Sequence, residues 1–112
     1  MLYIDDDGNI KLTRGDTAPL DLVVEDADGN PYDYSNDTVV LTIKKNTVTE
    51  AIVLQKTFNG GSVKLLPTDT EPLPYAKYRY DIQLTTSDGD NYTVIDPRNF
   101  ELTEEVNFDV PT

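Results

Sequence analysis

The chain has 112 residues, of which 21 are acidic and 9 are basic, and it contains neither cysteine nor histidine. A chain of this length can form one domain with its own hydrophobic core. The lack of cysteine excludes disulfide bonds and thiolate metal sites, and the net charge of −12 argues against binding to nucleic acid or to an anionic membrane.

The first residues, MLYIDD, lack the basic region and the long apolar region of a secretory signal. No apolar run in the sequence approaches the length that spans a membrane. We therefore expect the protein to be made and folded in a cytosol.

Apolar and polar residues alternate along almost the whole chain. A period of two is typical of half-buried strands, and no window has the spacing of an amphipathic helix. About seven or eight short strands at this spacing predict an all-β protein, an antiparallel β-sandwich. In chain order, the predicted strands are centred on residues 10–12, 20–24, 39–43, 52–54, 63–65, 78–84, 92–94 and 100–102.

Around these strands we expect an N-terminal arm over residues 1–8, the β-sandwich domain over residues 9–103, and a C-terminal tail over residues 104–112.

Turn residues separate several of the predicted strands. Asp88 and Gly89 lie between two alternating runs, which predicts a hairpin because glycine tolerates a positive φ and aspartate can bond the backbone that follows it. The segment 67–75 contains three prolines and cannot lie in a central strand. We expect a long crossover loop there.

The tripeptide Arg14-Gly15-Asp16 matches the integrin-binding sequence of some extracellular proteins, but here it lies between the first two predicted strands of the domain. The sequence favours a structural bend formed by Gly15, Asp16 and Thr17. In such a bend, glycine supplies a φ that other residues resist, and the Asp and Thr side chains can bond free backbone amides.

The residue types present argue against an enzyme. Without histidine, a serine nucleophile would lack its usual imidazole base. Paired carboxylates could perform acid–base chemistry, but the acidic residues fall mostly in predicted turns and at outward positions of predicted strands. We expect no catalytic residues.

The segment EDADGNPYD, residues 25–33, places four oxygen-bearing side chains around a glycine: Asp26, Asp28, Asn30 and Asp33. Calcium takes about six to eight oxygen ligands and often needs such a glycine. The EF-hand spacing is not met, because no glutamate stands at the twelfth position and the flanks are predicted strands. An ordinary hairpin turn is the favoured interpretation, and a calcium site is the alternative.

Several apolar and aromatic residues are candidates for contact with other subunits. Two tyrosines lie in the polar loop NPYDYSND, and tyrosine combines a large contact area with a polar group. Apolar residues near both ends of the chain would otherwise face solvent. The interface candidates are Leu2, Ile4, Tyr32, Tyr34, Val106 and Phe108.

Short motifs follow one another in a recognisable order. They are a Gly-Asp-Thr bend at residues 15–17, Asp-x-x-Gly-x-Pro at 26–31, Thr-Val-x-Leu-x-Ile at 38–43, and Tyr-x-Tyr-Asp-Ile-Gln-Leu at 78–84, before the Asp-Gly hairpin. This order resembles the N-terminal domain family of phage baseplate upper proteins and related small tail proteins of phages that infect Gram-positive bacteria. The resemblance covers roughly residues 9–103.

The resemblance implies an immunoglobulin-like β-sandwich that acts as an assembly module of the virion, bound to other phage structural proteins, with no enzymatic activity and no cofactor. Longer family members continue into a trimerising or fibre-like region, whereas this sequence stops at Thr112. We therefore expect an adaptor, plug or decoration subunit of the baseplate, tail or neck. The alternatives are an Ig-like or carbohydrate-binding module of a bacterial surface protein and, more remotely, a carboxylate-based hydrolase.

Overall fold

The structure is a computed structural model that describes residues 2–104. Within these residues the chain forms eight β-strands and one short helix. The elements are β1 (Leu2–Ile4), β2 (Ile10–Thr13), β3 (Ala18–Asp21), β4 (Thr38–Lys44), β5 (Ile52–Thr57), β6 (Ser62–Leu65), α1 (Pro67–Thr70), β7 (Ala76–Thr85) and β8 (Asn91–Thr103).

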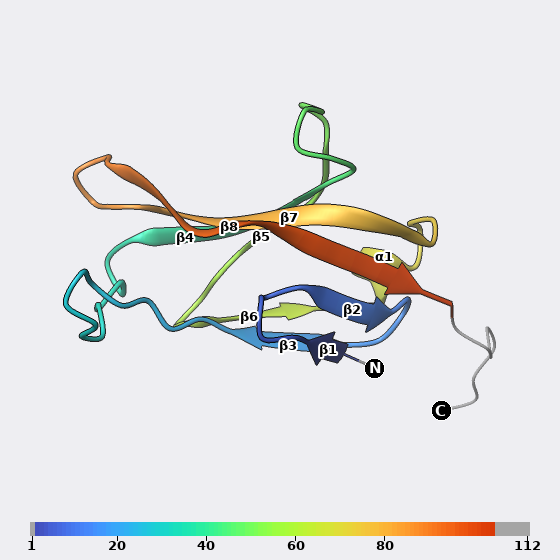
Figure 1. Ribbon diagram of the computed structural model, residues 1–112, viewed down its shortest axis with the longest axis horizontal. Coiled ribbons are helices and arrows are strands. Elements are labelled where there is room, and N and C mark those ends of the chain that lie inside the picture. The colour runs from blue at the N-terminus through green and yellow to red at the C-terminus, as the bar shows by residue number, and fades with distance from the viewer. Residues whose placement is uncertain (1, 105–112) are drawn as a thin grey trace.

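The strands form two sheets. Six of them make one sheet in the order β1-β2-β8-β7-β4-β5, and β3 pairs with β6 in a second sheet of two strands. Neighbouring strands are antiparallel except β2 and β8, which run parallel. In Figure 1, β3 and β6 lie in a layer below the one that contains β4, β7 and β8.

The core lies between the two sheets, because the buried residues of both belong to one hydrophobic cluster. Leu41 and Ile43 of β4 and Phe100 of β8 are almost completely buried, and they share the cluster with Leu20 of β3 and Leu65 of β6. Alternate residues of these strands point inward, as a period of two requires. Removal of this apolar surface from water is the main driving force for the fold. The predicted all-β class is confirmed.

Four segments differ in detail from the sequence-based expectation. The predicted arm 1–8 contributes β1, which pairs with β2 at the edge of the large sheet. The proline-rich segment contains the one-turn helix α1. The predicted strands at 92–94 and 100–102 are parts of one strand, β8, which spans residues 91–103.

The fourth difference is the early end of β3 at Asp21, although the alternation continues to Val24. The amide of Leu22 donates to the carbonyl of Gly61 at 3.0 Å, and the amide of Tyr32 donates to the carbonyl of Val24 at 2.8 Å. These backbone bonds replace the sheet pairing and lead the chain into a long loop before β4. No helix in the part of the chain that the structure describes is long and apolar enough to cross a membrane.

Candidate functional site

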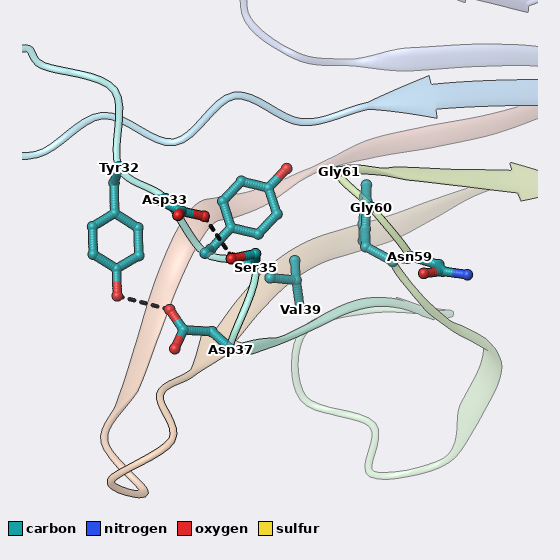
Figure 2. A pocket seen from close by; sticks show the side chains of 10 residues that line it. Tyr32, Asp33, Ser35, Asp37, Val39, Asn59, Gly60 and Gly61 are labelled. Carbon is teal, nitrogen blue, oxygen red and sulfur yellow. Dashed lines mark hydrogen bonds between the residues drawn. The ribbon is translucent and has the colours of Figure 1, made fainter.

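A cleft lies where the loop before β4 approaches the turn between β5 and β6. Its volume is about 530 Å³. We call it the tyrosine cleft, and Figure 2 shows its lining. It is lined by Tyr32, Asp33, Tyr34, Ser35, Asp37, Val39, Phe58, Asn59, Gly60 and Gly61.

One wall of the cleft combines aromatic and acidic side chains from the loop before β4. The Tyr32 hydroxyl donates a hydrogen bond to Oδ2 of Asp37 at 2.7 Å, and the backbone amide of Ser35 donates to Oδ1 of Asp33 at 3.0 Å. In Figure 2, Tyr32 and Asp37 lie on one side of Val39, and Asn59 and Gly60 lie on the other.

The opposite wall is a tight turn. The amide of Ser62 donates to the carbonyl of Asn59 at 3.3 Å, and the two residues between them, Gly60 and Gly61, have φ values of 63° and 86°. Positive φ at both central residues is the requirement of a type I′ turn, which glycine meets without strain. A Cβ on Gly61 would also lie 3.2 Å from the hydroxyl oxygen of Tyr34. A side chain at residue 61 would therefore require the Tyr34 hydroxyl to move by a few tenths of an ångström.

Tyr34 joins the two walls. Its hydroxyl donates a hydrogen bond to the carbonyl of Leu22, and the amide of Leu22 donates in turn to the carbonyl of Gly61. Beneath these groups, Val39 and Phe58 belong to the buried core. The cleft thus has an apolar floor and polar walls, a combination common in binding sites.

The electrostatics of the cleft follow from these bonds. The hydrogen bond to Asp37 raises the pKa of Tyr32, since ionisation would place two negative charges side by side. The amide and side chain of Ser35 lower the pKa of Asp33, so this carboxylate is charged at neutral pH. Burial raises the pKa of Tyr34, and the nearby Asp21 carboxylate adds to the effect. Both tyrosines therefore keep their hydroxyl protons at neutral pH.

The Arg14-Gly15-Asp16 sequence forms a turn, as its position suggested. The amide of Asp16 donates to the carbonyl of Thr13 at 3.1 Å, and Gly15 has a φ of 87°, as the third residue of a type II turn requires. The Gly15 amide donates to Oγ1 of Thr70 at 2.9 Å, so the bend is also held by a residue of α1.

Arg14 has a structural contact that the sequence did not suggest. Its guanidinium lies 4.3 Å from the centre of the Tyr75 ring, and Nη1 donates to the carbonyl of Leu73 at 3.3 Å. A cation over an aromatic ring contributes about 0.5–1 kcal/mol at exposed sites. Arg14, which is not among the predicted residues of the bend, therefore links the turn to the segment after α1.

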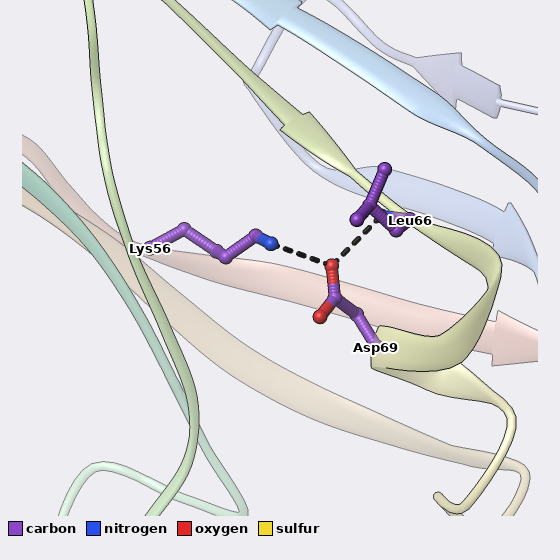
Figure 3. Close-up of polar contacts among 3 residues, drawn as sticks. All are labelled: Lys56, Leu66 and Asp69. Atoms are coloured by element: carbon purple, nitrogen blue, oxygen red, sulfur yellow. Dashed lines mark hydrogen bonds and ion pairs between the residues drawn. The ribbon is translucent and has the colours of Figure 1, made fainter.

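An ion pair fixes α1 to the edge strand β5 (Figure 3). Lys56 Nζ lies 2.8 Å from Oδ2 of Asp69, and the same oxygen accepts the amide of Leu66 at 2.7 Å, which caps the first turn of the helix. Burial raises the pKa of Asp69, but the bonds from Lys56 and Leu66 outweigh it and the pKa is lowered. We call residues 13–17 together with residues 66–75 the α1 corner.

The acidic loop that suggested calcium is one of three loops with the same geometry. In residues 5–9, 26–30 and 86–90, the first amide bonds the carbonyl of the fifth residue, and the glycine amide bonds the carbonyl of the first. Oδ1 of Asp26 accepts the amides of Asp28 and Asn30, so it stabilises its own turn. Within residues 2–104, no three or more Asp or Glu side chains gather where they could hold a metal ion.

The other sequence-predicted site residues lie apart from the cleft. Asp88 and Gly89 lie in the β7–β8 hairpin loop, where Gly89 has a φ of 92°. Leu2 packs against the core, whereas Ile4 is 48% exposed. Val106 and Phe108 lie outside the described residues.

Comparisons of the chain with protein-family models and with curated proteins gave no match.

Sequence reasoning singled out Tyr32 and Tyr34 as interface candidates and Asp33 as a calcium candidate, but it missed the rest of the cleft. Asn59, Gly60 and Gly61 gave only a turn signal, and Asp37 gave no signal of its own. The cleft exists because the chain brings a loop and a turn together from different parts of the sequence. Tyr32 and Asp37, which are joined by a hydrogen bond, are only five residues apart in the sequence. This short separation is the one indication of the site within the loop sequence.

Proposed function

We propose that the chain is a non-enzymatic structural protein of a phage virion, an assembly or adaptor module of the baseplate, tail or neck. It would be made in the cytoplasm of the host bacterium and would join other phage structural proteins in a homo- or hetero-oligomer. The order of the sequence motifs suggests this class of protein, and an uncharged edge strand, β1, is the observation that carries it.

The proposed architecture is an immunoglobulin-like β-sandwich. Its CFG sheet corresponds to β4, β7 and β8, with β5 beside β4 in the position of strand C′, and β3 and β6 correspond to strands B and E. In such domains a tyrosine near the start of strand F bonds the backbone a few residues upstream. Tyr78, near the start of β7, donates its hydroxyl to the carbonyl of Pro74 at 2.7 Å, which supports this assignment.

The edge strand β1 is suited to contact with another chain. Its sequence is Leu-Tyr-Ile, without a charge, in a protein in which 27% of residues are charged. Tyr3 is 65% exposed and Ile4 is 48% exposed. Exposed edges are usually protected by charges, proline or bulges, because an unpaired edge can accept a strand from another protein. An apolar edge strand without charge or proline supports a role in assembly.

The first test asks whether the chain is part of a virion. Phage particles are collected from cells that carry the gene, and their tails are purified. The purified tails should contain the chain in a fixed ratio to a tail protein, measured by mass spectrometry. Its presence in the lysate but not in purified tails would contradict the proposal.

The second test asks whether β1 is the contact. Tyr3→Lys together with Ile4→Lys should strongly reduce incorporation into tails, because burial of two ammonium groups in an interface is costly. Val48→Lys is the matched control, since Val48 is also apolar and 88% exposed but lies in the β4–β5 loop. Both proteins should keep wild-type melting temperatures. Equal incorporation of both variants would show that β1 makes no essential contact.

A further inference from the structure

The tyrosine cleft contains acidic side chains but no basic side chain among the described residues that line it. It brings two carboxylates, Asp33 and Asp37, and two tyrosine rings, Tyr32 and Tyr34, above an apolar floor. None of the ten residues that line it is basic. The carboxylates therefore have no positive partner among the residues that form the site.

Each carboxylate is oriented by hydrogen bonds from a residue of the same loop. Asp37 accepts the Tyr32 hydroxyl through Oδ2, and Asp33 accepts the Ser35 amide through Oδ1. Within the part of the chain that the structure describes, Oδ1 of Asp37 accepts no hydrogen bond, whereas Asp33 interacts with both the amide and the side chain of Ser35. Side chains held in this way lose little further conformational freedom when a donor binds.

We propose that the tyrosine cleft binds an arginine side chain of a partner protein. The planar guanidinium can donate to carboxylates on more than one edge and can stack on an aromatic ring, which an ammonium group does less well. The three methylenes of the side chain can cover the apolar floor formed by Val39 and Phe58.

Other ligand classes fit the same walls less well. A neutral saccharide would cover the two carboxylates without neutralising their charge, and burial of an uncompensated charge is unfavourable. Two carboxylates also provide too few ligands for calcium, which takes about six to eight oxygens. The net charge of −12 favours encounter with a basic partner over an acidic one. The site goes beyond the proposed role in a virion and does not depend on it.

The test uses the full chain and a blocked peptide, Gly-Gly-Arg-Gly-Gly, in an NMR titration of backbone amides. The amides of Ser35, Gly60 and Gly61 should shift on binding, and those of the α1 corner should not. The same peptide with citrulline in place of arginine is the neutral isostere and should bind at least several times more weakly. More salt should weaken binding of the arginine peptide, because the charges are partly exposed.

Substitutions locate the site. Asp37→Asn should weaken peptide binding by about three- to tenfold, as loss of one charge-assisted bond predicts, and Asp33→Asn is a second variant with the same expectation. Glu71→Gln is the matched control, because it also removes one negative charge but lies beside α1, at the opposite end of the molecule (Figure 1). It should leave the affinity within about twofold.

Four results would overturn the proposal. They are no amide shifts in the cleft, equal binding of the citrulline peptide, equal losses for Asp37→Asn and Glu71→Gln, and tighter binding of a saccharide such as N-acetylglucosamine at the same amides. None of these results bears on incorporation into tails, so a failure here and a failure of the proposed function can be told apart.

Discussion

The two ends of the molecule use the same kinds of side chain in opposite ways. In the α1 corner, polar groups bond one another: Thr70 accepts the Gly15 amide, and Asp69 accepts both Lys56 and the Leu66 amide. In the tyrosine cleft, Asp37 accepts the Tyr32 hydroxyl and Asp33 accepts groups of Ser35, but none of the described residues that line the cleft is basic. Paired polar groups at one end support the fold, and carboxylates without a basic neighbour in the cleft at the other end are available for binding.

One group in the α1 corner departs from this pattern. The hydroxyl of Tyr75 is buried and has no hydrogen-bond partner in the described part of the chain. The ring of Tyr75 nevertheless has a structural contact with Arg14. The corner is therefore stabilised by most, but not all, of its polar groups.

The largest effect expected in the α1 corner comes from Thr70→Val. Thr70 is completely buried, and the substitution keeps its shape while it removes the acceptor of the Gly15 amide. A buried donor left without a partner costs roughly 1–3 kcal/mol, so the free energy of unfolding measured in urea should fall by that amount.

The control for Thr70→Val is Thr68→Val, an exposed position in the same helix. It should change the free energy of unfolding by less than about 0.5 kcal/mol. Equal losses for the two variants would mean that the loss reflects the exchange of a hydroxyl for a methyl group in this helix and not the bond to Gly15.

The next largest effect is expected from Gly15→Ala. With a φ of 87° at residue 15, alanine would be strained, and the free energy of unfolding should fall by about 1 kcal/mol or more. Arg14→Ala should cost about 0.5–1 kcal/mol through the lost contact with Tyr75. A larger loss for Arg14→Ala than for Gly15→Ala would show that the side chain, and not the backbone of the turn, holds this bend.

The sequence predicted the strand faces and turns that depend on the pattern of adjacent residues. Alternation placed Leu41, Ile43 and Leu65 on inner faces, because the period of a strand is a property of adjacent residues. Gly15 likewise marked a turn, because a turn is also specified by adjacent residues. Alternation also continued through Leu22 to Val24, but there the bond from the Leu22 amide to Gly61 takes the chain out of the sheet. A partner far along the chain decided that boundary, so a local pattern could not.

The site was less predictable than the fold. Tyr32 and Tyr34 were identified because tyrosine in a polar loop combines a large contact area with a polar group, but Asp37 had no distinguishing pattern and Gly61 indicated only a turn. The contact of Thr70 with Gly15 spans 55 residues and likewise left no trace in the sequence. The contacts in the cleft and the contact of Thr70 with Gly15 both depend on which strands neighbour one another. The spacing of residues along the sequence does not give the order of the strands.

The ion pair between Lys56 and Asp69 should make a smaller, pH-dependent contribution to stability. The pKa of Asp69 in the folded protein lies below its ordinary value of 3.8. Stability from this group is therefore present above that value and is lost as the pH falls through the lower, folded-state pKa. Asp69→Asn should cost about 1 kcal/mol or less at neutral pH, and the difference from wild type should shrink on acidification, measured by urea unfolding at several pH values.

A double-mutant cycle isolates the pair from other carboxylates that titrate in acid. The coupling between Lys56→Met and Asp69→Asn should be favourable at neutral pH and should decline in acid and in high salt. A coupling that stays constant as the pH falls would show that the pair contributes through packing and not through charge.

The smallest effect on stability is expected from Tyr32→Phe in the tyrosine cleft. Tyr32 is 39% exposed, and water can replace its bond to Asp37, so the free energy of unfolding should change by less than about 0.5 kcal/mol. Tyr34→Phe is the matched control, because its hydroxyl bonds the carbonyl of Leu22 in a less exposed position and its loss should cost about 1 kcal/mol. The two variants separate the roles of the tyrosines within one loop: Tyr34 holds the walls of the cleft together, whereas Tyr32 mainly shapes its surface. If Tyr32→Phe destabilised the protein as much as Tyr34→Phe, the cleft would belong to the same supporting structure as the α1 corner, and the contrast between the two ends would fail.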